Sequence, residues 1–399
     1  MTRLAWLDAL RGWAAVTVAV FHLSPVVLGS ERHLRLFEIF DLGKYGVLLF
    51  FLVSGYVIPM SLERHGSLRR FWIGRIFRIY PAYLLAVVAG LALGAAGVVR
   101  LPGQLGAETT ATIAGHLTML QDLTGTRGVL RPFWTLSFEM VFYLIVAGLF
   151  AWRRHRVSAW WAAGLTAAAL GAGAALPGDL FGAGAGQRRI TAVAVLVLLA
   201  GGLCAYLTGR RRLVLAAAAG GICATALPLL NGHASDQVTS ASSAQAVQML
   251  AVLFAGTVIY RLQHRQIGRP VAAMSLALVC AGVAVHLEPG VAAAVAGTFA
   301  IAFVLRDRRV PAVLGWLGTV SYSLYLLHIP VLAVMNRLFD QPLLIAVAFT
   351  AGALGAAWAG HRLVELPGQA LGRRLTVIEI ATEGMDARTA RFGKRYESV

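Results

Sequence analysis

The chain has 399 residues, which at roughly 150 residues per domain would suggest two or three soluble domains. Hydrophobic residues make up 58% of it and charged residues only 13%, whereas soluble domains carry about 25% charged residues. With a mean hydropathy of +0.72, this composition excludes a soluble or disordered protein.

Long apolar segments follow one another along the whole chain. A membrane-spanning helix needs about 20 mostly apolar residues, and the segments that begin at 245, 271 and 290 are the shortest here. Twelve segments approach this length: 5–27, 43–62, 79–99, 133–151, 158–176, 190–208, 213–230, 245–260, 271–287, 290–305, 312–336 and 342–361. We therefore predict an all-α, polytopic transmembrane helical bundle of ten to twelve spanning helices.

The first segment also has features of a secretory signal peptide, because Arg3 precedes an apolar run. However, Arg11, Gly12 and Trp13 interrupt this run, and no clear small-residue cleavage site follows it. We therefore keep residues 5–27 as the first spanning helix.

The basic residues alternate between the connecting loops in a way that predicts the topology. Lysine and arginine accumulate on the cytoplasmic side of bacterial-type membrane proteins. With the N-terminus inside, 25 of the 35 basic residues lie in inner segments, nine lie in outer segments, and Arg11 lies within the first span. We predict that both termini are cytoplasmic. The net charge of +17 is then a topology signal, and nucleic acid is not a predicted partner.

Two ionisable residues lie on one face of the first span. Arg11 and His22 are eleven positions apart, which is three turns plus about 20°, with about 16 Å of axial separation. Ionisable side chains inside a span are costly and usually face the protein interior or a watery cavity. An arginine that snorkels to the interface and a packed histidine are the alternatives.

Three titratable residues are predicted to share one layer near the outer surface. At about 1.5 Å per residue, His22 lies about 7 Å from the outer end of its span, Glu139 about 9 Å and His328 about 12 Å. A histidine oriented by a nearby carboxylate is a suitable general base. A structural hydrogen bond for Glu139 and a packing role for His328 remain open.

An arginine-rich segment with interleaved aromatics, RRFWIGRIFRIYP, is predicted to form an inner loop with a short helix. It carries Arg69, Arg70, Arg75 and Arg78, and the last two share one helix face. Guanidinium groups suit bidentate contacts with phosphate, so the segment predicts the mouth of a site for a phosphorylated donor. Binding of lipid headgroups by this segment is the alternative.

Small and hydroxyl residues lie near mid-membrane in FFLVSGYVIP. Ser54 and Tyr56 are predicted to line the passage for the donor, and close helix packing is the alternative role. The three cysteines all lie in apolar segments, where a free thiol behaves as a small hydrophobe. We predict neither a disulfide framework nor a metal site.

Six blocks of the chain carry a family resemblance, in the family's order and from about residue 4 to 374. The chain resembles the membrane acyltransferase 3 family. The blocks are LAWLDALRGWAAVTVAVFHL, FFLVSGYVI, RFWIGRIFRIYP, FWTLSFEMVFYL, WLGTVSYSLYLLHIPV and HRLVELPGQALGRRL. The family core is usually described with ten helices, and the two excess spans lie between 158 and 305.

The resemblance implies an integral-membrane O-acyltransferase that moves an acyl group from cytoplasmic acyl-CoA to a hydroxyl of a carbohydrate or other small acceptor. By matching position, the resemblance implies that Arg11 and His22 are the family's essential pair and that Arg75 and Arg78 are its paired arginines. It also implies that Glu139 is the family's acidic residue in the fourth helix. The predicted roles are then catalysis by His22, Glu139 and His328, and donor binding by six residues. These are Arg11, Arg69, Arg75, Arg78, Ser54 and Tyr56.

The mechanism, acceptor and acyl group have open alternatives. His22 acts either as a base or as the carrier of a covalent acyl group. The acceptor is a carbohydrate, a macrolide or a cell-envelope component, and the acyl group is acetyl, propionyl or longer. A transporter without chemistry is the second hypothesis, although the two halves of the chain show no similarity to each other. A lipid-facing scaffold is the third.

Domain organisation and location complete the predictions. Residues 1–365 are predicted to form the transmembrane acyltransferase domain and 366–399 a polar cytoplasmic tail. The high alanine, arginine and glycine content is typical of a GC-rich bacterial genome, so we expect the bacterial cytoplasmic membrane, with its lipids as partners.

Overall fold

The structure, a computed structural model, describes residues 4–234 and 240–376. Within these ranges every regular element is helical, which confirms the predicted all-α class. Eleven of the described helices are long and apolar enough to cross a membrane, and a twelfth apolar helix has 16 residues. These numbers agree with the predicted ten to twelve spans.

Each predicted span corresponds to a helix or to a pair of consecutive helices. The helices are α1 (Ala5–Leu28), α2 (Ser30–Ile39), α3 (Leu42–His65), α4 (Leu68–Ala95), α5 (Gln104–Ala107), α6 (Thr109–Thr118), α7 (Trp134–Ala151), α8 (Ser158–Ala172), α9 (Ala185–Thr208), α10 (Arg211–Cys223), α11 (Ala226–Asn231), α12 (Ser243–Gln263), α13 (Arg269–His286), α14 (Pro289–Val304), α15 (Ala312–Leu338) and α16 (Pro342–Gly360). Short 3₁₀ turns, η1 (Asp122–Thr124) and η2 (Arg131–Phe133), precede α7.

The arginine-rich segment is helical, so the predicted inner loop was wrong. Helix α4 begins at Leu68, eleven residues before the predicted start of its span at 79, and runs unbroken to Ala95. Ser67 caps it, since its hydroxyl accepts a hydrogen bond from the backbone N–H of Arg70. The hydropathy pattern missed this part because arginines alternate with aromatics there, and long arginine side chains extend toward polar surroundings from an otherwise apolar helix.

Helix α2 was not predicted at all, because six of its ten residues are charged or polar; none of its residues is buried. Its polar and apolar side chains are segregated, which is typical of a helix that lies in the membrane interface. Ring contacts fix it to α1, since His33 and Phe37 both pack against Phe21. It therefore lies beside the end of α1 that carries His22.

The C-terminal helix continues past the predicted domain boundary at residue 365. Helical backbone extends to Thr376, and this part packs against α4, where Gly368 and Gly372 lie close to Phe77. The rest of the predicted polar tail, residues 377–399, lies outside the described residues.

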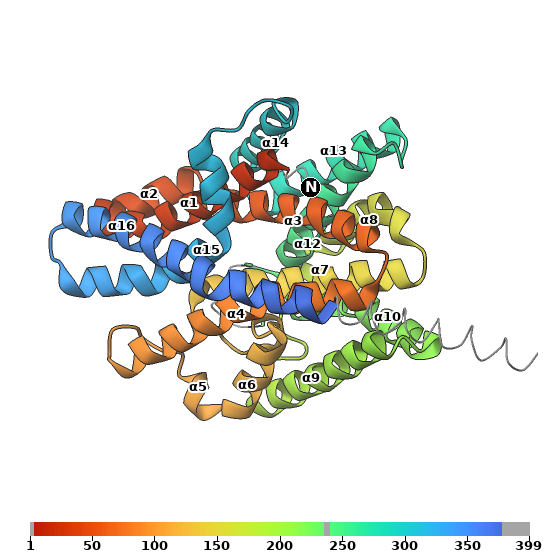
Figure 1. Cartoon of the computed structure of the whole chain (residues 1–399), viewed down its shortest axis with the longest axis horizontal. Helices are drawn as coiled ribbons and strands as arrows, with labels where there is room; N and C mark the ends of the chain where they lie inside the picture. The colour runs from red at the N-terminus through yellow and green to blue at the C-terminus, as the bar shows by residue number, and fades with distance from the viewer. Residues whose placement is uncertain (1–3, 235–239, 377–399) are drawn as a thin grey trace, which may run out of the picture.

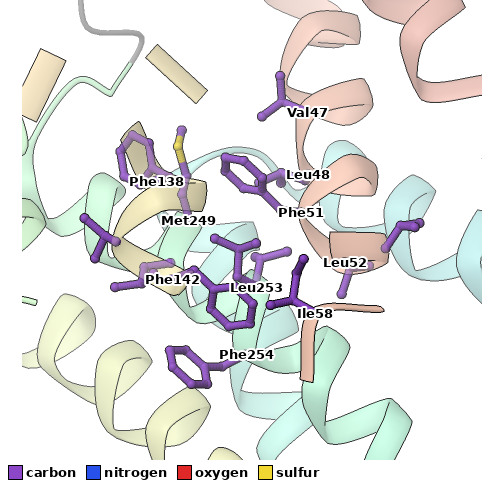
Figure 2. Close-up of a cluster of buried hydrophobic side chains, with 14 of the residues drawn as sticks. Val47, Leu48, Phe51, Leu52, Ile58, Phe138, Phe142, Met249, Leu253 and Phe254 are labelled. Carbon is purple, nitrogen blue, oxygen red and sulfur yellow. The ribbon is translucent and has the colours of Figure 1, made fainter. Parts of the chain in front are cut away.

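Three helices form the centre of the bundle. Helices α3, α7 and α12 lie in the middle of the molecule, whereas α9 lies at one edge (Figure 1). Inside the bundle, 94% of the apolar stretch of α12 is buried, compared with 17% for α9. Large apolar side chains from α3, α7 and α12 meet here (Figure 2), including a 6.1 Å ring contact between Phe51 and Phe138. Helix α9 is therefore suited to face lipid.

The central position of α12 explains why its sequence is less apolar than that of a lipid-facing span. Gln245 donates from its side chain to the backbone oxygen of His286, and Gln248 does the same to Val279. Both acceptors lie on α13. Polar side chains are tolerated within the bundle because such bonds between helices partner their N–H groups.

Close helix contacts depend on glycine at two crossings. At the first, α3 meets α12, and a Cβ at Gly55 would lie 1.8 Å from the backbone oxygen of Leu253. At the second, α1 meets α15, and a Cβ at Gly318 would lie 2.0 Å from the backbone oxygen of Asp8. Small residues let helix backbones approach closely in membranes. The second crossing sets the position of α1, and with it Arg11 and His22.

We expect Gly318→Ala to destabilise the α1–α15 crossing, because even one methyl group must displace backbone. Overpacking of this kind typically costs about 1–3 kcal/mol. Gly315→Ala is the matched control, since a Cβ at Gly315, one turn earlier on α15, has no neighbour within 4 Å. Thermal unfolding in nanodiscs measures the difference; equal melting temperatures for the two variants would contradict the proposed crossing.

Candidate functional site

A cavity lies between α1, α3, α4, α7 and α15 and encloses about 730 Å³ of empty space, counting the part open to the outside. Five of the nine predicted site residues line it, although they come from four helices. The five are Arg11, Ser54, Arg75, Arg78 and Glu139. Helix packing thus brings together most of the residues that were predicted to bind the donor.

Three arginines form one end of the cavity, which we call the arginine end: Arg11, Arg75 and Arg78. Arg75 lies over the rings of Phe71 and Tyr143, at 5.6 and 5.9 Å from the ring centroids. Arg11 makes a 3.8 Å ion pair with Asp8. Three guanidinium groups around one cavity create a site for a polyanion such as a diphosphate.

Glu139 faces the arginine end rather than a histidine. Its carboxylate accepts hydrogen bonds from the hydroxyls of Ser54 and Tyr143, the latter at 3.3 Å. It lies within electrostatic reach of Arg11 and Arg75. The bond from Ser54 on α3 is the structural cross-helix bond that the sequence left open as an alternative. Among the described residues, no hydrogen bond joins Glu139 to His22 or to His328, so the layer predicted for these three residues does not bring the carboxylate to a histidine.

His22 and His328 lie side by side, and we call them the histidine pair. Their ring centroids are 5.2 Å apart, and the two residues come from α1 and α15. His328 is fully buried, whereas His22 is partly exposed and lies within electrostatic reach of Arg131 and His33. The structure thus brings two of the three predicted catalytic residues together.

One hydrogen bond determines which nitrogen of His328 is free. Its Nδ1 lies 3.2 Å from the backbone oxygen of Leu324, and since a carbonyl oxygen only accepts, Nδ1 carries the proton. Its Nε2 is then an acceptor, and it is buried without a hydrogen-bond partner in the described part of the chain. An N–H of His22 or a substrate hydroxyl is the kind of group that this nitrogen can accept from.

A buried polar loop fixes the start of α7, where the cavity approaches the histidine pair. Within this loop the side-chain N–H₂ of Gln121 donates both to Asp122 and to the backbone oxygen of Phe133. Burial raises the pKa of Asp122 to about 7 and lowers the pKa of His116. His116 is thus favoured in its neutral form, and its Nε2 accepts from the backbone N–H of Val129 at 3.1 Å. The hydrogen bonds of Gln121 and His116 therefore help to hold the loop in shape.

Two predicted donor-binding residues do not line the cavity. The Tyr56 hydroxyl donates to Gln263 at 2.5 Å, and its ring packs edge-on against Trp6 and Tyr260. Arg69 lies in the first turn of α4 and outside the set of lining residues. For Tyr56 these contacts match the packing role that the sequence left open.

The sequence prediction missed five lining residues with hydroxyl groups, namely Thr135, Tyr143, Ser321, Tyr322 and Tyr325. A helical signal was available for two of them. Tyr143 is four positions from Glu139 and Tyr325 is three positions before His328, so each lies near the face of a predicted residue.

The fold and cavity define a multi-pass membrane bundle with a basic internal site. The family model described as "Acyltransferase domain", that of the acyltransferase 3 family, matches residues 4–259 and 193–362. The chain belongs to the acyltransferase 3 family, as its sequence blocks indicated. No solved structure shows a significant match to the chain.

Two curated relatives illustrate the range of similar proteins. The chain is 31% identical to "Acyltransferase MdmB" from Streptomyces mycarofaciens over 150 residues, which cover 36% of this chain and 38% of that protein. It is 32% identical to "Nodulation protein 10" from Rhizobium leguminosarum bv. viciae over 167 residues, which cover 37% of this chain and 45% of that protein. The chain thus matches less than half of the length of these relatives.

Proposed function

We propose that this protein is an integral-membrane O-acyltransferase that transfers an acyl group from acyl-CoA to a hydroxyl of a small acceptor. The observation that carries the proposal is the single cavity that begins at the arginine end and extends to Tyr325, next to His328. Membership of an acyltransferase family and the similarity to a relative named as an acyltransferase support the reaction class.

The arginine end would hold the donor. The nucleotide part of CoA carries phosphates, and guanidinium groups bind phosphate through paired N–H donors. In the proposed orientation the N-terminus is cytoplasmic, so the arginine end opens toward the compartment that contains acyl-CoA, in the cytoplasmic membrane of a bacterium. The long thin arm of the donor then extends through the cavity and brings the thioester to the histidine pair.

The histidine pair would carry out the proton transfers. His22 removes the proton of the acceptor hydroxyl while its oxygen attacks the thioester carbonyl, and the C–S bond then breaks. The sulfur leaves as CoA thiolate and takes up the proton from His22. His328 would position the imidazole of His22. The two rings lie 5.2 Å apart, and Nε2 of His328, which has no hydrogen-bond partner in the described part of the chain, would fix the His22 tautomer by accepting from an N–H of that ring.

Glu139 has a different role in this proposal from the one predicted from sequence. It lies within electrostatic reach of Arg11 and Arg75 and is bonded to Ser54 and Tyr143, so its negative charge would offset the repulsion between the guanidinium groups. The acceptor, whether carbohydrate, macrolide or cell-envelope component, approaches His22 from the side of Arg131. In the alternative mechanism, the acyl group is first transferred to His22, with release of CoA, and then passes from His22 to the acceptor hydroxyl.

The experiment that tests this function is direct. Purified protein in nanodiscs is incubated with radiolabelled acetyl-CoA, with and without a hydroxyl-rich acceptor extract, and free CoA thiol and labelled ester are quantified. We expect acceptor-dependent CoA release with one labelled ester per thiol. Neither turnover nor CoA binding across several acyl donors, in folded protein, would favour the transporter hypothesis.

A further inference from the structure

The last of the six sequence blocks, HRLVELPGQALGRRL, has no role in the proposed mechanism, yet it contains an irregular helical turn. At the end of α16 the helix changes into a π-turn, η5 (His361–Glu365), in which the backbone N–H of Leu366 donates to the oxygen of His361. Pro367 follows directly and has no N–H for the regular bond to Leu363, so a wider turn is expected before it. Such turns inside α-helices are frequently found at functional sites.

A buried carboxylate lies in this π-turn. Glu365 is 4% exposed, and each of its oxygens has a partner. Oε1 accepts from the hydroxyl of Ser323 on α15, and Oε2 lies 3.1 Å from Nδ1 of His361. The cluster is not a catalytic triad, because in a triad the histidine and not the carboxylate contacts the serine. Burial of a carboxylate is costly without such partners, and here they connect the π-turn to α15.

The helix that follows the π-turn lies along α4 (Figure 1), and glycines allow a close approach. A Cβ at Gly368 would lie 2.7 Å from the ring of Pro81 and 2.9 Å from the backbone oxygen of Phe77. A Cβ at Gly372 would lie 2.7 Å from the side chain of Phe77. Neither Phe77 nor Pro81 lines the cavity, whereas Arg78, which lies between them in the chain, does. The C-terminal helix therefore supports α4 behind Arg78.

Helix α15 contacts the same part of α4 from the side of the cavity. The hydroxyl of Tyr322 donates to the backbone oxygen of Ile79 at 3.0 Å, and both residues line the cavity. Ile79 directly follows Arg78, and Tyr322 directly precedes Ser323. The part of α4 that carries Arg78 thus has two supports, α15 and the C-terminal helix. Glu365 joins these supports through its bond to Ser323.

We infer that Glu365 is a positioning residue of the donor site, which holds α15 and the C-terminal helix in the arrangement that places Arg78 in the cavity. The inference rests on the proposed function, since that function assigns Arg78 to the donor. Glu365 does not line the cavity, so it acts through the position of α4 and not by contact with the donor. Without its carboxylate, Ser323 and His361 lose this partner, and the two supports can shift against each other.

The test measures the Kd of CoA for the protein in nanodiscs. Glu365→Ala should raise this Kd by about two- to thirtyfold, the range for residues that affect a site without contacting its ligand. Glu365→Gln retains an oxygen that can accept from Ser323, so its Kd should stay close to that of wild type. A role in stability alone would lower the folded fraction and leave the Kd of the folded protein unchanged.

A double variant shows whether the effect passes through Arg78. Arg78→Ala removes the guanidinium that Glu365 is inferred to position, so Glu365→Ala should raise the Kd much less in this background than in wild type. Glu108→Ala is the matched control, because Glu108 also makes a partly buried ion pair, with Arg188, and neither residue lines the cavity. This control should leave the Kd unchanged, whatever it does to stability.

If Glu365→Ala does not fold, Ser323→Ala serves instead, because it removes one bond and leaves the carboxylate beside His361. A raised Kd that is not additive with Arg78→Ala would support the inference. An unchanged Kd in the folded variant, additive effects, or an equal rise in Glu108→Ala would overturn it. Wild type that neither binds CoA nor releases it from acyl donors would refute the proposed function, and the inference with it.

Discussion

His22→Ala is expected to reduce acyl transfer by about 10³-fold, within the range that general acid–base catalysis contributes. The imidazole is the partly exposed member of the histidine pair, so it is the one that an acceptor hydroxyl can reach. Acceptor-dependent release of CoA thiol in nanodiscs measures the loss. The donor Kd should change little, because the arginine end remains intact.

A neighbouring histidine provides the control for this variant. His33 lies on α2 and shares a 2.7 Å hydrogen bond with Ser24, and no contact joins it to His328 in the described structure. His33→Ala should keep most of the transfer activity. Unchanged turnover in folded His22→Ala would remove His22 from the mechanism. Label that stays on denatured wild type but is absent from His22→Ala would favour the acyl-histidine order.

The positioning role of His328 has a separate readout. His328→Gln retains a side-chain acceptor and should keep part of the activity, whereas His328→Leu should lose nearly all of it. Because His328 would fix the tautomer of His22 in the proposed mechanism, the pH dependence of turnover should shift in His328→Gln. A merely structural role would change the amount of folded protein and leave the pH profile as in wild type.

Much of the fold could be predicted from sequence, because the membrane imposes a length and a polarity on each span. The exceptions have physical causes. Helix α4 begins earlier than predicted, at Leu68, because hydropathy does not distinguish an arginine-rich helical turn from a loop. Helix α2 escaped because amphipathic interface helices lack a long apolar run.

The sequence could predict most of the residues that line the candidate site, but not which of them contact one another. Depth along a helix follows from residue number, so Glu139 could be placed near the level of His22. Rotation of one helix against another does not follow from residue number, and it is this rotation that turns Glu139 toward Ser54 and Arg11. Tyr325 was missed for a related reason, since an aromatic in an apolar helix usually indicates packing.

Arg78→Ala is expected to raise the donor KM by about 10- to 100-fold, which corresponds to the loss of one charged hydrogen bond of about 1.5–3 kcal/mol. Arg78 lines the cavity one turn beyond Arg75, on the same face of α4. Arg78→Lys should have an intermediate effect, because it retains the charge but not the paired donors. The kcat should change less than the KM in both variants.

The same helix supplies the control and separates donor binding from lipid binding. Arg70 lies two turns earlier on α4 and does not line the cavity, and its backbone N–H, which Ser67 caps, survives substitution. Arg70→Ala should leave the donor KM near the wild-type value. The arginines would bind lipid headgroups and not the donor if Arg70→Ala and Arg78→Ala raise the donor KM equally, or if both variants only weaken binding to anionic lipids. The donor site would be supported if only Arg78→Ala raises the donor KM and if this increase becomes smaller at high salt. Salt screens the attraction between guanidinium and phosphate, so the contribution of Arg78 should decrease.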